Sequence, residues 1–221
     1  MLDIHTHIIP NVDDGSKDLE TSLKLLEQAE KEGVTKIVLT PHMNYIQKDI
    51  ALIKKQEALL NEHYNGPIEF ILGSEIKYYD KMVADLKQNK LLTINNSKYV
   101  LVEFDFNQEE NIADAVYELT VANYIPIIAH IERYSYLDVK DYKVLKEAGA
   151  LIQINASSVE YKKYEKKIKY LLKKDLVDFI ASDCHNLEKR NVNFANIKKY
   201  VLKHAKKSYA KFFEEIFSFD N

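Results

Sequence analysis

The chain alternates short apolar runs with longer amphipathic segments. Seven apolar runs are rich in β-branched residues and flanked by turn residues, which predicts strands at 1–4, 36–40, 68–72, 99–104, 125–129, 150–155 and 177–181. Apolar residues at helical spacing predict helices at about 19–31, 112–123 and 161–173. Gly33 and Gly149 stand where glycine ends a helix. The pattern therefore predicts repeated strand–helix units.

Seven such units in succession predict an α/β fold with parallel strands. Each strand reads as a continuous apolar run, so we expect both faces of the sheet to be buried. A closed or nearly closed barrel is the natural arrangement at this length. A doubly wound open sheet is the alternative, but it usually carries a glycine-rich loop after the first strand, where this chain has His-Thr-His.

Composition narrows the class of protein. The 221 residues contain no repeat or linker, which predicts a single domain over 1–221. A net charge of −3 and the lack of a basic stripe argue against a nucleic-acid partner. No apolar run approaches 18 residues, so we expect no direct membrane insertion. The single cysteine excludes an intrachain disulfide and predicts a cytoplasmic protein.

Polar side chains gather where the predicted strands end. Five of the seven histidines follow or end strands, and acidic residues join them; the full set is His5, His7, Asp14, His42, Glu75, Glu103, His130, Asp183 and His185. In α/β barrels the carboxyl ends of the strands share the face that holds the active site. We interpret His63 and His204, which lie in helix-like segments, as structural or surface residues.

This set of side chains predicts a metal centre. His5 and His7 are two residues apart, as are Asp183 and His185, so in extended chain each pair points the same way. Nine ligands are too many for one ion, and carboxylates can bridge two. The mixed nitrogen and oxygen set indicates a multinuclear centre suited to Mn²⁺, Fe or Zn²⁺.

Arginine is confined to the same region. Of the 31 basic side chains only Arg133 and Arg190 are arginine, and they follow His130 and His185 by three and five residues. A guanidinium group makes bidentate contacts with phosphate. We therefore interpret both arginines as phosphate-binding residues.

A competing hypothesis comes from SDCHNLEKR, in which Cys184 and Arg190 have the spacing of cysteine-dependent tyrosine phosphatases. Three arguments oppose a cysteine nucleophile. The intervening residues include no glycine for a phosphate-cradling loop. Extended chain that points Asp183 into the site turns Cys184 away. Neighbouring carboxylates also oppose the low thiol pKa that a nucleophile needs. We interpret Cys184 as a small packing residue.

The motifs DIHTHIIPNVDDG, TPH, GSEI, LVEF, IIAHIERY and IASDCHN occur in this order and resemble the bacterial PHP-type protein tyrosine phosphatases. These capsule-associated, manganese-dependent enzymes act on bacterial tyrosine kinases. The resemblance covers nearly the whole chain and implies a distorted (β/α)₇ barrel, the PHP fold, with up to three Mn²⁺ ions. It places His5, His7, Glu75 and Asp183 around one ion, Glu75, Glu103 and His130 around a second, and Asp14, His42 and His185 around the third.

The expected reaction is metal-assisted hydrolysis of a phosphate monoester. Arg133 and Arg190 would stabilise phosphoryl charge, and His42 or a bound water would protonate the leaving group. The resemblance implies a phosphotyrosyl protein as the substrate, such as the tail of a bacterial tyrosine kinase. Histidinol-phosphate phosphatase or another PHP phosphomonoesterase is the alternative. A PHP phosphodiesterase or exonuclease is less favoured, because this chain has no basic stripe that could bind nucleic acid. A catalytically inactive barrel that only docks a kinase is also less favoured, because docking would not need an intact ligand set.

Overall fold

The computed structural model describes residues 1–44, 46, 49–214 and 217–219 and alternates strands with helices. The strands are β1 (Leu2–Thr6), β2 (Lys36–Leu39), β3 (His42–Met43), β4 (Glu69–Leu72), β5 (Glu75–Lys77), β6 (Tyr99–Glu103), β7 (Ile125–Ile128), β8 (Leu151–Asn155) and β9 (Phe179–Ala181). All pairings between them are parallel. Each of the seven predicted strands is present, and β3 and β5 are additional.

The two additional strands arise where the chain bends. Thr40 and Pro41 separate β2 from β3, and Gly73 and Ser74 separate β4 from β5. Hydrogen-bonded pairing consequently divides the strands into two sheets, with the orders β1-β2-β4 and β3-β5-β6-β7-β8-β9. After the bends, β3 and β5 pair with each other, and their register sets His42 beside Glu75.

The two sheets join edge to edge at the opposite seam. Thr6, at the end of β1, forms a parallel bridge with Cys184 beyond β9. Backbone bonds reinforce this seam, from His7 N–H to Cys184 C=O at 2.9 Å and from Asp183 N–H to His5 C=O at 2.9 Å. If β2 with β3 and β4 with β5 each count as one position, seven positions form the curled sheet. The predicted distorted (β/α)₇ arrangement is confirmed, and the open doubly wound alternative is wrong.

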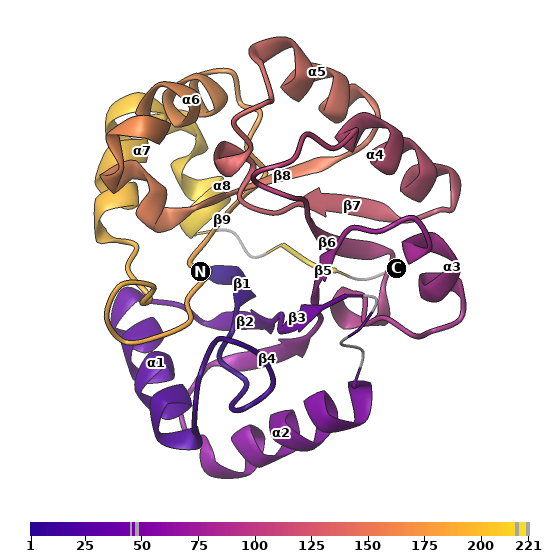
Figure 1. The fold of residues 1–221 in the computed structure, drawn as a ribbon. Helices are drawn as coiled ribbons and strands as arrows, with labels where there is room; N and C mark the ends of the chain where they lie inside the picture. Colours follow the sequence, from indigo (N-terminus) through magenta and orange to yellow (C-terminus); the bar gives the residue numbers. More distant parts are fainter. Residues whose placement is uncertain (45, 47–48, 215–216, 220–221) are drawn as a thin grey trace.

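Helices surround the curled sheet on its outer side (Figure 1). They are α1 (Leu19–Glu32), α2 (Ile50–His63), α3 (Met82–Lys87), α4 (Ile112–Val121), α5 (Val139–Glu147), α6 (Lys162–Lys173), α7 (Ala195–His204) and α8 (Tyr209–Phe213). The three predicted helices are α1, α4 and α6. In α1 the Asp18 side chain caps the first turn, and Gly33 ends the helix at φ 84°. Gly149, at φ 96°, comes just after the C-cap of α5.

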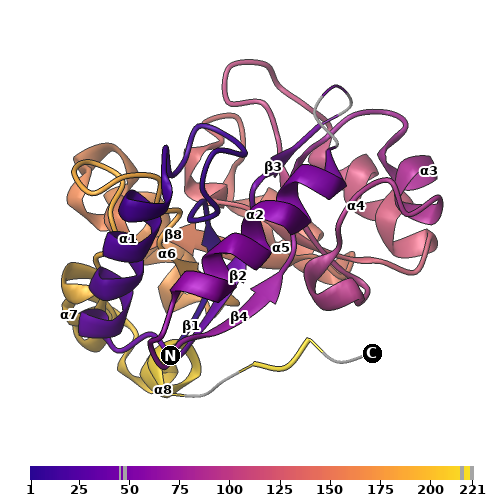
Figure 2. The same ribbon diagram turned by 90° about the horizontal axis from the view of Figure 1, so that it is seen from below.

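The inside of the curled sheet is apolar at the amino ends of the strands. Leu2, Leu101, Ile127 and Phe179 belong to one buried cluster there. Phe219 covers this end, with its ring 5.2 Å from that of Tyr99, and Figure 2 shows residues 217–219 beneath the strands. The carboxyl ends of the strands lie at the opposite end of the curled sheet and lead into the loops there. Among the described residues, no helix combines the length and apolar character needed to cross a bilayer.

Candidate metal centre

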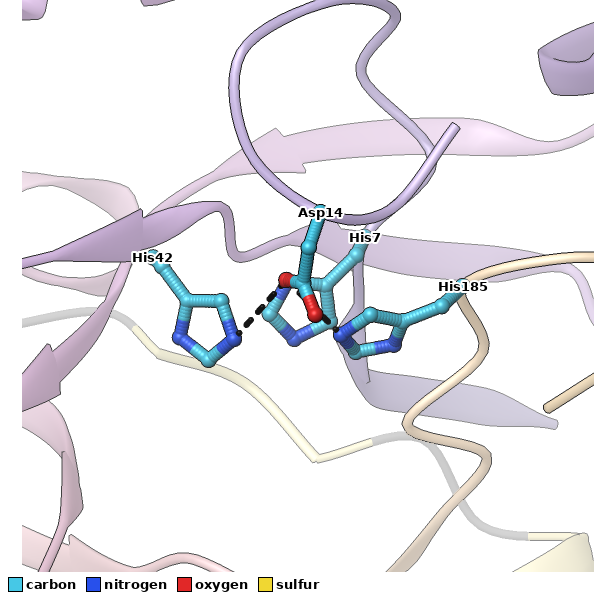
Figure 3. Close-up of side chains that lie close together, drawn as sticks. All are labelled: His7, Asp14, His42 and His185. Carbon is cyan, nitrogen blue, oxygen red and sulfur yellow. Dashed lines mark ion pairs between the residues drawn. The ribbon is translucent and has the colours of Figure 1, made fainter. Parts of the chain in front are cut away.

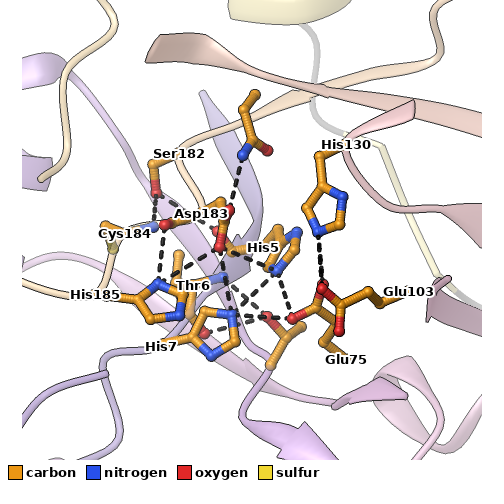
Figure 4. Close-up of polar contacts among 12 residues, drawn as sticks. His5, Thr6, His7, Glu75, Glu103, His130, Ser182, Asp183, Cys184 and His185 are labelled. Atoms are coloured by element: carbon orange, nitrogen blue, oxygen red, sulfur yellow. Dashed lines mark hydrogen bonds and ion pairs between the residues drawn. The ribbon is translucent and has the colours of Figure 1, made fainter. Parts of the chain in front are cut away.

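The structure brings all nine predicted ligand residues together at the carboxyl ends of the strands (Figure 3 and Figure 4). They come from β1, β3, β5 and β6 and from the segments that follow β1, β7 and β9; they are His5, His7, Asp14, His42, Glu75, Glu103, His130, Asp183 and His185. Most are buried, whereas the side chain of Asp14 is 67% exposed. His63 and His204 end helices α2 and α7 and belong to none of the candidate metal-binding groups.

Irregular backbone aims these side chains into the site. The pairing of β1 with β2 shifts between Asp3 and Thr6, a bulge of the kind that redirects side chains beside active sites. His130 and Asp183 have positive φ angles of 32° and 52°. The expectation of extended chain at Asp183 was therefore wrong, although its carboxylate does lie near His185, with Oδ1 3.5 Å from Nδ1.

His5 and His7 present lone pairs to each other. His5 Nδ1 lies 3.2 Å from Gln153 Oε1, and His7 Nδ1 lies 2.7 Å from Asp13 Oδ2. Both partners are acceptors, which places the ring protons on Nδ1 in the neutral imidazoles. The two unprotonated Nε2 atoms then face each other at 3.1 Å. This arrangement is repulsive unless one of the two nitrogens gains a proton, and a divalent cation held by both nitrogens would relieve the repulsion.

Glu75 lies at the centre of the cluster. Its Oε2 is 2.9 Å from His42 Nδ1 and 3.2 Å from His5 Nε2, and its Oε1 is 2.9 Å from His130 Nε2. Oε2 is buried and has no hydrogen bond of acceptable geometry. Burial opposes ionisation, but His5 and His42 hold the pKa of Glu75 well below its usual value. Burial and the nearby Glu75 charge raise the pKa of Glu103 to about 7.

A second group of ligands lies toward the solvent side (Figure 3). Asp14 Oδ1 is 3.3 Å from His42 Nε2 and 3.5 Å from His185 Nε2, and the His7 ring stacks 3.8 Å from that of His185. His185 Nδ1 contacts the Asp183 carbonyl at 3.0 Å, so its buried Nε2 is left without a hydrogen bond. This orphaned nitrogen, together with the Asp14 carboxylate, suits a cation.

The donor atoms form several overlapping sets. The sets are His7 with Asp14, His42 and His185; His5 with His7 and Glu75; His5 with His130 and Asp183; and His42 with Glu75 and Glu103. Within each set the atoms lie within 4.8 Å of one another. Imidazole nitrogens and carboxylate oxygens are ligands for Mn²⁺, Fe and Zn²⁺. The residues therefore fit a cluster of divalent cations, with Glu75, His5, His7 and His42 shared between positions.

Three residues that orient the ligands were missed by the sequence analysis. Asp13 binds His7 and accepts from the backbone N–H groups of His42 and Gly15 at 2.9 Å each. Gln153 Oε1 accepts from the backbone of His130 at 2.8 Å as well as from His5.

Asn155 completes this network. Its side chain accepts from Gln153 and donates to Asp183 Oδ2 at 2.7 Å. Gln153 and Asn155 occupy alternate positions of the otherwise apolar strand β8, and this pattern could have identified them.

The two arginines flank Asp183 at the mouth of the site. Arg190 Nη2 lies 2.8 Å from Asp183 Oδ1, and Arg133 Nη1 lies 3.5 Å from Asp183 Oδ2. The Arg133 guanidinium stacks 4.2 Å from the centre of the Phe106 ring, which holds it in place. Both side chains are about one-third exposed, so an anion entering from solvent can reach them.

Cys184 has the environment of a packing residue. Its side chain is fully buried in the hydrophobic core that packs the helices against the strands. Burial and then the nearby Asp3 charge raise the pKa of its thiol above the ordinary value. A buried thiol with a raised pKa carries little thiolate, so the structure agrees with the rejection of a cysteine nucleophile.

Comparisons with known proteins agree with this geometry. A family model described as capsular polysaccharide synthesis, CpsB/CapC, matches residues 1–218. The tyrosine-protein phosphatase CpsB of Streptococcus agalactiae is 33% identical over 221 residues, which covers 91% of this chain and 89% of that protein.

Solved structures give the same picture. The fold matches crystal structures described as YwqE from Bacillus subtilis and CpsB from Streptococcus pneumoniae, unique metal-dependent tyrosine phosphatases. The TM-score is 0.86 at 28% identity, with 98% of this chain and 96% of the other covered. Histidinol phosphate phosphatase from Lactococcus lactis has a TM-score of 0.61 at 15% identity, covering 94% of each chain, and this likeness concerns the fold alone.

Proposed function

Because this chain belongs to the capsular polysaccharide synthesis family CpsB/CapC, we propose that it is a metal-dependent tyrosine-protein phosphatase that acts in capsule synthesis. The observation that carries the proposal is the convergence of nine nitrogen and oxygen ligand residues with two arginines at one end of the curled sheet. The family match extends from residue 1 to 218, which supports the proposal of one catalytic domain.

We assign the nine residues as ligands of up to three ions. Glu75 would be a ligand shared between two ions, because its two oxygens face different histidines. Asp14, His42 and His185 would hold the ion nearest the solvent. We propose Mn²⁺ as the cation, with Fe or Zn²⁺ as alternatives, because carboxylates and imidazoles make up the set and the chain's single cysteine is buried outside it.

Arg133 and Arg190 bind the phosphoryl oxygens of the substrate and stabilise the charge that develops on them. Divalent cations, when bound, supply Lewis acidity that lowers the pKa of water and neutralises phosphoryl charge. His42 is 26% exposed, whereas the side chains of His5, His7, His130 and His185 are at most 1% exposed. We therefore propose His42 as the residue closest to the leaving group. A tyrosyl oxygen, with a pKa near 10, needs only modest help from an acid.

The shape of the site favours a protein substrate. A cleft of about 290 Å³ between Arg133, Tyr161 and Arg190 is open to solvent. An open cleft accepts a phosphotyrosine side chain from a flexible segment without enclosing the rest of the substrate. The tail of a bacterial tyrosine kinase is the substrate we propose.

The test compares kcat/KM at matched Mn²⁺ for a phosphotyrosyl peptide, a phosphoseryl peptide and histidinol phosphate. We expect a clear preference for the phosphotyrosyl peptide and loss of all activity after EDTA treatment. A preference for histidinol phosphate would overturn the assignment to tyrosine phosphatases and leave the metal centre intact. Full activity of metal-free protein would overturn the metal-dependent mechanism itself.

A further inference from the structure

The cleft beside the metal centre continues outward past the two arginines. It is formed by the 3₁₀ turn Ala156–Glu160, the start of α6 and the segment 182–190 that follows β9. Four of its lining side chains are cationic, namely Arg133, Lys163, Lys189 and Arg190, and one is a carboxylate, Asp183. The outer part of this cleft is not used by the hydrolysis proposed above.

The two lysines differ from the two arginines in their partners. Arg133 and Arg190 both lie beside Asp183, which is itself buried. Neither Lys163 nor Lys189 has a carboxylate within 4.0 Å among the residues that the structure describes. The outer cleft therefore carries two ammonium groups that form no ion pair with any described residue.

Local structure holds both lysines at the rim. The Lys163 ammonium lies 4.5 Å above the centre of the Tyr164 ring, a cation–π contact. Lys189 belongs to a tight turn in which the Asn186 side chain accepts from the backbone N–H groups of Glu188, Lys189 and Arg190 at 3.0–3.2 Å. The ammonium group of Lys163 and the backbone of Lys189 consequently occupy defined places.

A second, neighbouring cleft has a different charge balance. This cleft shares Lys189 with the first and is bordered by His185 and the start of α1. Its other charged lining residues are two lysines, Lys17 and Lys24, and three acids, Asp18, Glu20 and Glu188. Within it Lys24 already pairs with Glu20 at 2.6 Å. An anion that accompanies the phosphate is thus attracted toward Lys163 and Lys189 and away from α1.

We propose that Lys163 and Lys189 form a subsite for a second anionic side chain on the same phosphotyrosyl peptide. This inference rests on the proposed phosphatase function and adds a specificity to it. Aspartate, glutamate and a further phosphotyrosine share the required chemistry. The contacts are exposed and screened by salt, so we expect about a fivefold effect per lysine at low ionic strength, decreasing as salt is added.

The test measures kcat/KM for three peptides that contain the same cleavable phosphotyrosine. The peptides differ only in the residue two positions from this phosphotyrosine, which is serine, glutamate or a second phosphotyrosine. The wild type is compared with the double variant Lys163→Ala/Lys189→Ala and with Lys162→Ala/Lys166→Ala, which removes two exposed lysines of α6 that do not line the cleft. Hydrolysis of p-nitrophenyl phosphate reports on the metal centre alone.

We expect the wild type and the control variant to prefer one or both anionic peptides, and Lys163→Ala/Lys189→Ala to lose this preference. Its rates on the serine peptide and on p-nitrophenyl phosphate should stay unchanged. Which anionic peptide is preferred distinguishes a carboxylate from a second phosphate. Equal rates on all three peptides, or a preference that survives in the double variant, would overturn the subsite. Hydrolysis of p-nitrophenyl phosphate without any peptide hydrolysis would instead overturn the protein phosphatase function.

Discussion

The two ends of the curled sheet's interior are built by the same strands and have opposite chemistry. Strand β6 contributes Leu101 to the apolar cluster and, two residues later, Glu103 to the metal centre. The chain leaving β9 passes from Ala181 to Asp183 in the same way. The apolar end is stabilised by burial alone, whereas the polar end buries charges that need partners or cations. A residue that contributes to stability and a residue that contributes to the candidate metal centre thus lie only two positions apart in the chain.

Electrostatics make this contrast concrete. Burial alone would lower the pKa of His5, but the Glu75 and Asp183 carboxylates raise it to about 9. Burial also opposes protonation of His42, but the Glu75 carboxylate raises the pKa of His42 to about 11. Both imidazoles must lose a proton before they bind a cation, so metal binding releases protons. The apolar end has no such dependence on ions.

The largest effect is expected at the centre of the polar end. Glu75→Gln keeps the size of the side chain but removes the charge that faces four histidines, namely His5, His7, His42 and His130. We expect kcat/KM to fall by about 10³-fold or more, since several kcal/mol of charge stabilisation are lost and each 1.36 kcal/mol is tenfold. Metal content by mass spectrometry should fall in parallel. Activity within tenfold of wild type would show that Glu75 is not the bridging ligand.

The matched change at the apolar end is Leu101→Ala. Leu101 is fully buried, so we expect the free energy of unfolding to fall by about 2–5 kcal/mol, as measured by urea denaturation. The kcat/KM per folded molecule should stay within twofold. The isosteric change Glu103→Gln on the same strand should do the reverse, with lost activity and little lost stability. If both variants lost activity and stability equally, the separation of the two ends would be disproved.

The arginines sharpen the comparison at the mouth of the polar end. Arg133→Ala and Arg190→Ala should each lower kcat/KM, because one charge-assisted contact with the phosphate is lost. The loss of transition-state stabilisation should be about 1–3 kcal/mol for each variant. The ions should remain bound, and lysine should not restore full activity, since it lacks the planar fork. Wild-type kinetics in both alanine variants would remove these residues from the mechanism.

A smaller effect is expected at Asp13, which contacts the ligand residue His7. Asp13→Ala removes the acceptor that fixes the His7 ring. Orienting partners of metal-bound histidines contribute about 10–100-fold to metal affinity, so we expect the Mn²⁺ affinity to fall by that factor. Competition with a fluorescent chelator measures it, and excess Mn²⁺ should restore most activity. An unchanged affinity with lost activity would point to a direct catalytic role for Asp13.

The sequence was more informative about the ends of the strands than about the bends within them. Apolar runs revealed seven strands, because burial on both faces leaves a clear signal. Strands β3 and β5 have only two and three residues, too few to form a pattern. Asp13 was missed although Asp14 was found, since only the folded loop brings Asp13 to His7. The positive φ of Asp183 was likewise invisible in a residue type that usually adopts extended or helical backbone.

Cys184 lies beside the polar end but belongs to neither region, since its backbone closes the seam next to the metal centre while its side chain packs in the core between the helices and the strands. It should show the smallest effect on catalysis. Cys184→Ser places a hydroxyl among apolar groups and should reduce the free energy of unfolding by about 1–3 kcal/mol. Its kcat/KM per folded molecule should remain within about twofold of wild type.

The control for this last change is Cys184→Ala, which removes the thiol without adding a polar group. Iodoacetamide should also leave the wild type active, because a buried thiol with a raised pKa is scarcely ionised. Metal content must be measured with each rate, since the neighbours of Cys184 are Asp183 and His185. Loss of turnover in both variants at wild-type metal content would revive the cysteine nucleophile. A loss that follows the metal content would mean that the seam which holds these two ligands had shifted.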